Sequence, residues 1–448
     1  MIILNCKNNY FCLLKAIRMR QIIVFFSLLL LSFALKAQET ITVMQYNLLE
    51  YGNYNSGWAN CNETTNNTQG KDEAIRVVLD YVKPDILTVN EFGATQTIQD
   101  NFIRHNLNVN GVSYWKSDNI VNYANSNIIN HIFYNAEKMA LQKHAVVRTT
   151  LRDIDVYELF FKTQSLAAQD TVKLVCIVAH LKAGDTNDDA NRRRDMLRNA
   201  MYYVDEHYAN DNVLIMGDFN MYTSSEAGYQ LLTHTYENPD ARFVDPLSLV
   251  DGVGSWDNNR QFAPYHTQST KAWVDYPDCP SGGGMDSRFD MMMMSDEVFM
   301  GFRSLKYVAG SYCAVGNDGD HFNQSVNDGY NSAVPSNVAN ALFTVSDHLP
   351  IMMKLNLYAQ WGMEENETFS FEVYPNPVND VLLIRMQTAY PYGENGREYR
   401  ITNLLGQTLM TGRIEAENQR IDISDLPQGL YFISVNGVIS KFVKTASY

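Results

Sequence analysis

The sequence predicts a large α/β domain with a mixed or antiparallel sheet over residues 38–360, followed by a small all-β domain over residues 369–448. The chain has 448 residues, more than one ordinary domain uses, and 46% of them are apolar, enough for a large core. Strand and helix patterns alternate up to about residue 360, whereas only short strand patterns follow. The acidic and polar residues 361–368 are expected to form a linker.

The elements of the large domain follow from the spacing of their apolar residues. Helices are predicted over residues 71–82 and 187–208, where apolar residues recur three or four positions apart. Apolar runs predict strands over residues 41–48, 86–91, 128–134, 139–147, 156–162 and 172–180. Few helices separate the later strands, which favours a mixed or antiparallel sheet over a doubly wound one. Residues 51–70 and 277–335 lack periodicity and are expected to be long, irregular loops.

Two clusters of like side chains are interpreted as structural. A basic cluster on the second helix is expected to be a solvated face paired with nearby acids rather than a phosphate site; its members are Arg192, Arg193, Arg194 and Arg198. The four methionines at residues 291–294 are expected to pack in a buried strand rather than to ligate a metal.

The C-terminal part reads as a small β-sandwich. Short strand patterns separated by turn signals lie at residues 369–374, 381–386, 399–403, 408–412, 419–423, 430–435 and 440–444. This part contains no histidine and no cysteine, so no catalytic role is expected for it.

The amino end has the pattern of a secretory signal peptide. Met19-Arg20 precedes an apolar stretch at residues 22–35, and Ala37 offers a small residue for cleavage. The stretch is shorter than the ~20 residues that a membrane-spanning helix needs, so we expect no stable span in the mature protein. Export would place the protein in an oxidising compartment, where disulfides persist.

Four cysteines remain after the predicted cleavage, and their spacing matches no zinc-binding pattern. Cys176 lies in an apolar run and is expected to be a buried free thiol. Cys279 and Cys313 lie in loop-rich sequence, so a disulfide between them is one of the pairings considered, with the partner of Cys61 left open.

Polar side chains stand at the ends of several predicted strands. Asn47, Glu91 and His180 each close an apolar run, and Asp218 with Asn220 follows another. Two further blocks adjoin apolar runs and contain Asp290, Asp347 and His348. Polar groups at strand ends commonly build active sites, because a rigid sheet there meets variable loops.

In their order along the chain, these blocks resemble the endonuclease/exonuclease/phosphatase superfamily, which has the DNase I-like fold. The resemblance covers roughly residues 40–357 and rests on Tyr46-Asn47, Glu91, His180-Leu181-Lys182, Gly217-Asp218-Phe219-Asn220, Arg288-Phe289-Asp290 and Ser346-Asp347-His348. It implies a four-layer α/β sandwich, in which two mixed β-sheets are flanked by helices. It also implies a metal-dependent hydrolase acting on phosphate esters.

The resemblance further implies a role for each of these residues. Glu91 would be the main Mg²⁺ ligand, helped by Asn47 and Asp347, with Mn²⁺ or Ca²⁺ as alternative ions. His348 would act as general base on the attacking water or steady the phosphate, and Asp290 would orient its ring.

The remaining candidates would contact the nucleophile or the substrate. Asp218 and Asn220 would position the attacking water and the phosphate, and His180 would donate to a phosphate oxygen. Arg152 is the candidate for a substrate contact that the family often places before the His180 strand. His321, beside Asp320 in the glycine-rich residues 316–323, is proposed to border the substrate cleft, with an ordinary surface loop as the alternative.

The C-terminal part resembles a type IX secretion C-terminal sorting domain. The blocks that carry this resemblance are Val373-Tyr374-Pro375-Asn376-Pro377-Val378, Asn403-Leu404-Leu405-Gly406-Gln407, Leu426-Pro427-Gln428-Gly429-Leu430-Tyr431 and Lys441-Phe442-Val443-Lys444. It implies the type IX secretion machinery as a partner. The protein would pass through the periplasm to the cell surface or the medium.

Three functions remain open at this point. The first is a secreted endonuclease acting on DNA or RNA. The second is a phosphomonoesterase or a lipid phosphodiesterase, sphingomyelinase-like or acting on inositol phosphates, and the third is a catalytically inactive surface-binding protein. The formal net charge of −15 argues against strong non-specific binding of nucleic acid, but several acids gather at the proposed site, where a divalent ion would offset their field.

Overall fold

The computed structural model describes most of the chain outside the amino end. The described residues are 39–54, 61–149, 151–162, 172–234, 241–247, 255–274, 279–301, 303–357, 371–386, 397–403, 407–414, 418–435 and 438–445. The predicted signal peptide and linker lie outside them. The chain divides into two compact units, residues 1–361 and 362–448. Within the described ranges, no helix is both long and apolar enough to cross a membrane.

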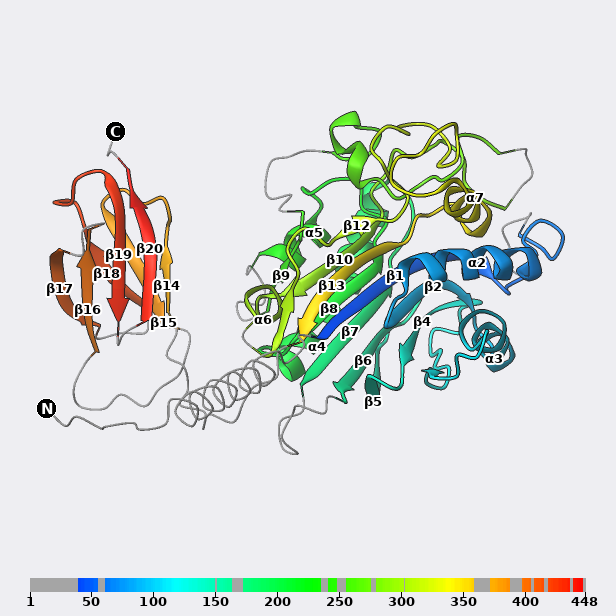
Figure 1. Ribbon diagram of the computed structural model, residues 1–448, viewed down its shortest axis with the longest axis horizontal. Coiled ribbons are helices and arrows are strands. Elements are labelled where there is room, and N and C mark those ends of the chain that lie inside the picture. The colour runs from blue at the N-terminus through cyan, green and yellow to red at the C-terminus, as the bar shows by residue number, and fades with distance from the viewer. Residues whose placement is uncertain are drawn as a thin grey trace, which may run out of the picture. The chain divides into compact units, whose positions relative to one another are not determined.

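The first sheet of the large unit has seven strands in the order β11-β13-β1-β2-β4-β3, with β12 also paired to β13 (Figure 1). Its strands are β1 (Glu39–Tyr51), β2 (Ile86–Gly93), β3 (Trp115–Lys116), β4 (Ile128–Asn135), β11 (Leu305–Tyr307), β12 (Cys313–Ala314) and β13 (Ile351–Leu357). Strands β1 and β2 run parallel, and the other pairs are antiparallel, so the sheet is mixed.

The second sheet has six strands in the order β5-β6-β7-β8-β10-β9. Its strands are β5 (Met139–Val147), β6 (Ile154–Phe161), β7 (Lys173–His180), β8 (Val213–Asp218), β9 (Phe243–Val244) and β10 (Asp290–Ser295). Here too a single pair, β7 and β8, is parallel, and the other pairs are antiparallel.

Helical crossovers account for both parallel pairs, because two parallel neighbours need a long connection. Helix α2 (Thr68–Val82) leads from β1 to β2, and α4 (Asn187–Tyr208) leads from β7 to β8. Each helix begins where a polar side chain caps it: Asn67 accepts from two backbone N–H groups, and Thr186 accepts from one. The other helical segments are α3 (Gln96–Phe102), the π-helical η1 (Ile103–Leu107), α5 (Ala227–Thr233), the 3₁₀-helical η2 (Arg260–Tyr265), α6 (Asp296–Met300) and α7 (Ser336–Val345).

Two apolar cores order these elements into four layers. One core joins the two sheets to each other and includes apolar residues of α2 and α7, and the other lies between the second sheet, α4 and α5. The methionine run of β10 serves both cores because successive strand residues face opposite sides: Met292 and Met294 belong to the first, Met291 and Met293 to the second. The predicted four-layer α/β sandwich with two mixed sheets is confirmed.

The small unit is an antiparallel β-sandwich, as predicted. It pairs a three-stranded sheet, β14-β15-β18, with a four-stranded sheet, β17-β16-β19-β20, and one core joins them. The strands are β14 (Phe371–Tyr374), β15 (Val381–Met386), β16 (Arg397–Thr402), β17 (Thr408–Ile414), β18 (Asn418–Asp422), β19 (Gly429–Val435) and β20 (Val438–Lys444).

Two expectations about the large unit need correction. The stretch 277–335 is not irregular throughout, because it contains β10, α6, β11 and β12. The basic cluster on α4 is paired with acids, as expected, but it is not wholly solvated: Arg193 is 1% exposed and pairs with Glu226. Its guanidinium also donates to the carbonyls of Lys182 and Gly184, so it fastens α4 to the loop that follows β7.

Candidate metal centre and catalytic site

The site lies where the carboxyl ends of the two parallel pairs meet. In the first sheet Asn47 of β1 is in register with Asn90 of β2, so the following residue, Glu91, lies next to Asn47. In the second sheet His180 of β7 is in register with Asp218 of β8. Because both strands of a parallel pair end on the same edge, each crossover brings two distant polar residues together.

Three side chains from the two sheets form a compact group of potential metal ligands. One ligand atom each from Glu91, His180 and Asp218 lies within 4.8 Å of the others. His180 Nε2 is 3.8 Å from Glu91 Oε1 and 3.5 Å from Asp218 Oδ2. Glu91 is the most exposed of the three, with 17% of its side chain accessible. The group is therefore most accessible to solvent at Glu91.

Asn47 holds this group together through its amide nitrogen. Its Nδ2 donates to Glu91 Oε1 at 3.0 Å and to Asp218 Oδ2 at 3.1 Å. Its Oδ1, the atom that would ligate a cation, instead accepts from the backbone N–H of Leu49 at 3.0 Å. In this orientation the Asn47 side chain positions the two carboxylates and does not present its oxygen to a cation. The expected role of Asn47 as a metal ligand stays a prediction.

Asp347 approaches the same cluster from the turn before β13. Its Oδ2 accepts from the backbone N–H of Ser281 at 2.8 Å and from Gln268 Nε2 at 3.4 Å. Its Oδ1 is buried and has no hydrogen-bond partner among the described residues. A buried carboxylate oxygen without a partner is costly unless a cation satisfies it, so the donor set fits a divalent ion.

His348 forms a buried pair with Asp290. The two side chains meet at 2.7 Å between His348 Nδ1 and Asp290 Oδ2, and both residues are almost fully buried. Thr267 Oγ1 accepts from the backbone N–H of Asp290, which fixes the start of β10. The other ring nitrogen of His348, Nε2, lies 3.7 Å from Asp218 Oδ2 and therefore faces the metal-ligand group.

Burial and neighbouring charges shift the pKa values of the two histidines in opposite directions. Burial lowers the pKa of His348, but the carboxylates of Asp290 and Asp218 outweigh it and hold that pKa well above its usual range. Burial lowers the pKa of His180 well below its usual range, and the charges of Arg152 and His348 lower it further. Their surroundings therefore shift the two pKa values in opposite directions, upward for His348 and downward for His180.

The carboxylates of the cluster resist ionisation in the absence of a cation. Burial raises the pKa of Glu91 to about 7, and the charge of Asp347 adds to the effect. Burial also raises the pKa of Asp218 to about 6, although the charge of His348 opposes this. A bound divalent ion would favour the ionised forms, and carboxylate oxygens beside an imidazole suit Mg²⁺ or Mn²⁺.

Asn220 and Arg152 also lie at this site. The backbone N–H of Asn220 donates to Asp218 Oδ1 at 3.0 Å, so one oxygen of that carboxylate is held by the turn after β8. Arg152 donates from Nε to the carbonyl of His180 at 3.1 Å and from Nη2 to that of Leu181 at 2.6 Å. Arg152 therefore supports the end of β7, and its charge acts on Glu91 and Asp218.

His321 is not brought together with the other candidates. Its Nδ1 lies 2.8 Å from Asp318 Oδ1, and its Nε2 lies 2.8 Å from the carbonyl oxygen of Asp328. Both ring nitrogens are thus engaged within the histidine's own loop, and the side chain is buried. These contacts favour an ordinary loop, rather than a border of the substrate cleft, for residues 316–323. A substrate contact by His321 stays a prediction.

The structure adds residues to the site that sequence reasoning missed. Gln268 Nε2 lies 2.8 Å from His348 Nε2, and Gln268 is only partly buried, so it stands at the opening of the site. Lys71 is almost fully buried, and its Nζ donates to the carbonyls of Leu48 and Leu49 just after Asn47. Neither has a local signal: Gln268 lies in irregular sequence, and Lys71 looks like an ordinary solvated lysine at a helix start.

A second missed network links the two sheets beneath the site, and Asn90 is its centre. Asn90 Oδ1 accepts from Gln45 Nε2 and from the backbone N–H of Asp218, both at 2.7 Å. Asn90 Nδ2 donates to Asn130 Oδ1 at 2.7 Å. Because the residue preceding Glu91 also holds Asp218, one side chain sets the spacing between the two sheets at the site.

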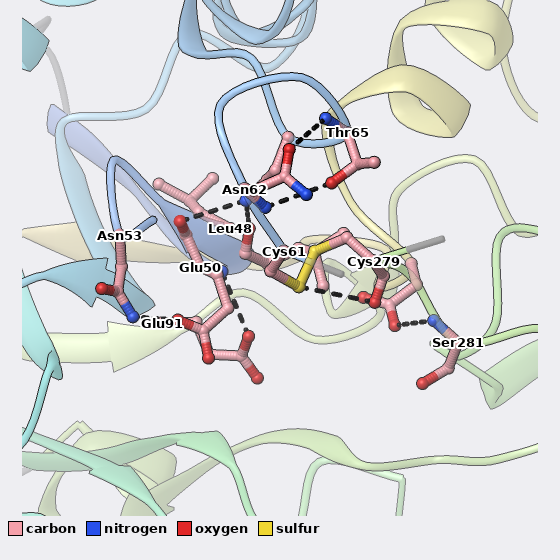
Figure 2. The surroundings of a disulfide bond; sticks show 12 residues. Leu48, Glu50, Asn53, Cys61, Asn62, Thr65, Glu91, Cys279 and Ser281 are labelled. Atoms are coloured by element: carbon pink, nitrogen blue, oxygen red, sulfur yellow. Dashed lines mark hydrogen bonds between the residues drawn. A yellow bond between two sulfur atoms is a disulfide. The ribbon is translucent and has the colours of Figure 1, made fainter. Parts of the chain in front are cut away.

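The disulfide considered between Cys279 and Cys313 does not form. Cys61 and Cys279 pair instead (Figure 2). Among the described residues, Cys176 is a buried free thiol and Cys313 an exposed one. Cys313 lies on β12, where it is in register with Met352 of β13 and away from Cys279. The burial of Cys176 agrees with its apolar sequence context.

Comparison with known proteins finds likenesses for both parts of the chain. A family model described as a secretion system C-terminal sorting domain matches residues 372–446. A search of curated proteins finds no match.

Among solved structures, a humanized TDP2 from D. rerio is 14% identical with a TM-score of 0.42, and the match covers 71% of this chain and 99% of that one. The catalytic domain of human nocturnin is 14% identical with a TM-score of 0.42, covering 72% and 97%. An endonuclease/exonuclease/phosphatase family protein from Bacteroides thetaiotaomicron is also 14% identical with a TM-score of 0.42, covering 72% and 99%. The family model covers the part of the chain in which the sequence motifs resemble a sorting domain.

Proposed function

We propose that the protein is an exported, divalent-metal-dependent phosphoesterase that hydrolyses phosphodiester bonds, with DNA or RNA as its substrate. One observation carries the proposal: the ligand group Glu91–His180–Asp218, assembled from two sheets, faces the buried His348–Asp290 pair. Phosphoester hydrolysis needs a cation at the phosphate, an acceptor for the proton of the attacking water and a donor to the developing negative charge. The cluster contains a candidate for each.

Glu91 would hold the cation together with Asp218, His180 and the unpartnered Oδ1 of Asp347. When bound, the ion would neutralise charge on the phosphate and stabilise the charge that develops during hydrolysis. Asn47 would keep Glu91 and Asp218 at a fixed separation through its two amide hydrogens. The chain thereby supplies a preorganised, acidic pocket for a small cation.

The protein's own groups divide the proton transfers between them. In its ionised form, Asp218 would position a water beside it and accept a proton from that water. The raised pKa of His348 favours its protonated form, in which Nε2–H would donate to a phosphate oxygen. Of the two roles considered for His348, its charge state favours steadying the phosphate.

Asp290 keeps His348 in that state and orientation. A carboxylate 2.7 Å from Nδ1 fixes which way the ring faces and stabilises its positive charge. Asn220 would restrict the rotation of the Asp218 carboxylate through the bond from its backbone N–H. Arg152 would add positive charge behind His180, which favours an anionic substrate.

Export is proposed from the two ends of the chain. The C-terminal residues match a secretion system sorting domain, which points to the cell surface or the medium. The predicted signal peptide would direct the chain through the periplasm first. A disulfide between Cys61 and Cys279 is compatible with an oxidising environment.

The substrate class can be tested with the chain from residue 38 onward, in Mg²⁺ and in EDTA. Plasmid DNA, RNA, bis-nitrophenyl phosphate, nitrophenyl phosphate, sphingomyelin and inositol phosphates would be offered to the wild type, Asp218→Ala and His348→Ala. His207→Ala, at an exposed position of α4, is the matched control.

We expect cleavage of nucleic acid and of the nitrophenyl diester, abolished by EDTA and reduced at least ~100-fold by either site substitution. A preference for the monoester, sphingomyelin or inositol phosphates would replace the nuclease assignment by one of those activities. Hydrolysis indifferent to EDTA and to both substitutions would contradict the metal mechanism. No hydrolysis together with no metal binding would favour a binding protein.

A further inference from the structure

The disulfide joins two connections of the large unit, and Figure 2 shows it together with Glu50, Glu91 and Ser281. Cys61 belongs to the connection between β1 and α2, and Cys279 to the connection between η2 and β10. The two cysteines are 218 residues apart in the chain. Glu50, at the end of β1 where the first connection begins, donates its backbone N–H to one carboxylate of the site, and Ser281 of the second connection donates its backbone N–H to another. These two bonds carry the inference.

The first loop reaches Glu91 through the residues that follow Asn47 in the chain. Glu50 donates its backbone N–H to Glu91 Oε2 at 3.2 Å. The carbonyl of Glu50 accepts from Asn66 Nδ2 at 3.1 Å, and the backbone N–H of Asn66 donates to the carbonyl of Asn62, next to Cys61. A short series of hydrogen bonds therefore connects the disulfide to the carboxylate of Glu91.

The second loop reaches Asp347 by a shorter route. Ser281, two residues after Cys279, donates its backbone N–H to Asp347 Oδ2 at 2.8 Å. The carbonyl of Ser281 accepts from Ser269 Oγ at 2.6 Å, which ties it to the segment that carries Gln268. Holding Oδ2 in this way leaves Oδ1 of Asp347 as the free, buried oxygen.

Other hydrogen bonds also hold both connections: the N–H of Gly283 donates to the carbonyl of Ala272, and the N–H groups of Thr64 and Thr65 donate to Asn62 Oδ1. No helix or strand lies between β1 and α2, or between η2 and β10, within the parts of these connections that the structure describes. The N–H of Ser281 positions Asp347 only as well as its own connection is positioned, and Asn66 of the other connection supports the carbonyls of Leu49 and Glu50 at the end of β1. The disulfide between the two connections therefore influences the positions of two proposed metal ligands, Glu91 and Asp347.

We propose that the Cys61–Cys279 disulfide is a positioning element of the metal centre: it keeps the N–H of Glu50 on Glu91 and the N–H of Ser281 on Asp347, and its loss weakens divalent-cation binding. The proposal rests on the proposed function only in requiring that the centre bind a cation. Loss of groups that orient metal ligands typically lowers metal affinity ~10–100-fold, and we expect a change of this size.

The test measures metal affinity directly, without a substrate. Mn²⁺ and Mg²⁺ would be titrated calorimetrically into the chain from residue 38 onward, as wild type, as the double variant Cys61→Ser/Cys279→Ser and as Cys313→Ser. Cys313 is a free, exposed cysteine and provides the matched control. The proposal expects Kd to rise at least ~10-fold in the double variant alone.

Reduction of the wild type offers an independent arm. Dithiothreitol transfers two electrons and two protons to the disulfide, giving two thiols and cyclic oxidised dithiothreitol; Kd is expected to rise, and to return after re-oxidation. The double variant should not respond to the same treatment. Far-UV circular dichroism would confirm that each sample is folded.

Asn66→Ala serves as a second variant should the double variant lose its native spectrum. It keeps the disulfide but removes the bonds to the carbonyls of Leu49 and Glu50, so it should also weaken binding. Unchanged affinity in a folded double variant, or in Asn66→Ala, would overturn the proposal. Wild type that binds metal but hydrolyses no phosphoester would refute the proposed function alone, whereas wild type that binds no metal would refute both.

Discussion

Replacing Glu91 by glutamine tests the electrostatics of the centre without any substrate. In the folded, metal-free protein burial raises the pKa of Glu91 from 4.5 to about 7, so ionising this carboxyl is unfavourable there. A pKa that is higher in the folded state than in the unfolded state contributes stability below the unfolded value. That contribution is lost as the pH rises through the folded value.

The wild type should therefore lose stability between about pH 4.5 and pH 7 through this group, and the glutamine variant should not. A tenfold change in the ionisation equilibrium corresponds to about 1.4 kcal/mol, so the advantage of Glu91→Gln should grow by roughly 2–3 kcal/mol from pH 5 to pH 8. Because only 17% of the side chain is accessible, solvent screens this effect only slightly.

The variant also has a fixed cost, since an amide nitrogen cannot accept the N–H of Glu50. That cost is roughly 1–3 kcal/mol and does not depend on pH, so only the change with pH is diagnostic. Guanidinium unfolding in EDTA at pH 5 and pH 8 would measure how the free-energy difference between variant and wild type changes with pH. Glu73→Gln, at an exposed position, is the control. A free-energy difference between variant and wild type that is equal at the two pH values would refute the reasoning. Saturating Mg²⁺ should restore stability at pH 8 to the wild type far more than to the variant.

Two other substitutions probe the site and the core. Asp290→Asn removes the nearest charge from His348, so the pKa of that histidine should fall by at least about 1; an NMR titration of the imidazole in EDTA would detect this, and an unchanged pKa would contradict the assigned pairing. Arg288→Ala should destabilise the protein by about 3–5 kcal/mol, because it leaves the buried Asp245 carboxylate without its bidentate partner. The matched control Arg242→Ala, which breaks a more exposed pair with an aspartate, should cost about 1 kcal/mol or less, and equal costs in chemical unfolding would count against the role of burial.

Local patterns were sufficient for most of the elements that build the fold. The predicted ranges of β5, β15 and α4 match the structure residue for residue, and the predicted helix over residues 71–82 ends where α2 ends. These segments have a strong apolar period, and the period reflects which face of each element is buried. The short helices α3, α5 and α7 were not predicted.

The candidate site was predictable for a related reason. His180 and Asp218 end β7 and β8, and Asn47 and Glu91 lie near the carboxyl ends of β1 and β2. In each sheet a crossover places the two residues beside each other. A chain with this order of elements has little choice about where these side chains meet. Their chemical roles are proposals, but their proximity follows from topology.

What the sequence by itself determined about this protein is the set of elements, the two-part organisation and the residues that gather at the strand ends. Only the tertiary structure decided that Cys61 pairs with Cys279 and that Gln268 reaches His348. It also decided that His321 is engaged within its own loop. The apolar period of a helix or strand reflects which of its faces is buried, so it can be recognised in the sequence. Contacts between irregular loops depend on how the loops pack in three dimensions. For two cysteines 218 residues apart, the local sequence does not indicate that packing.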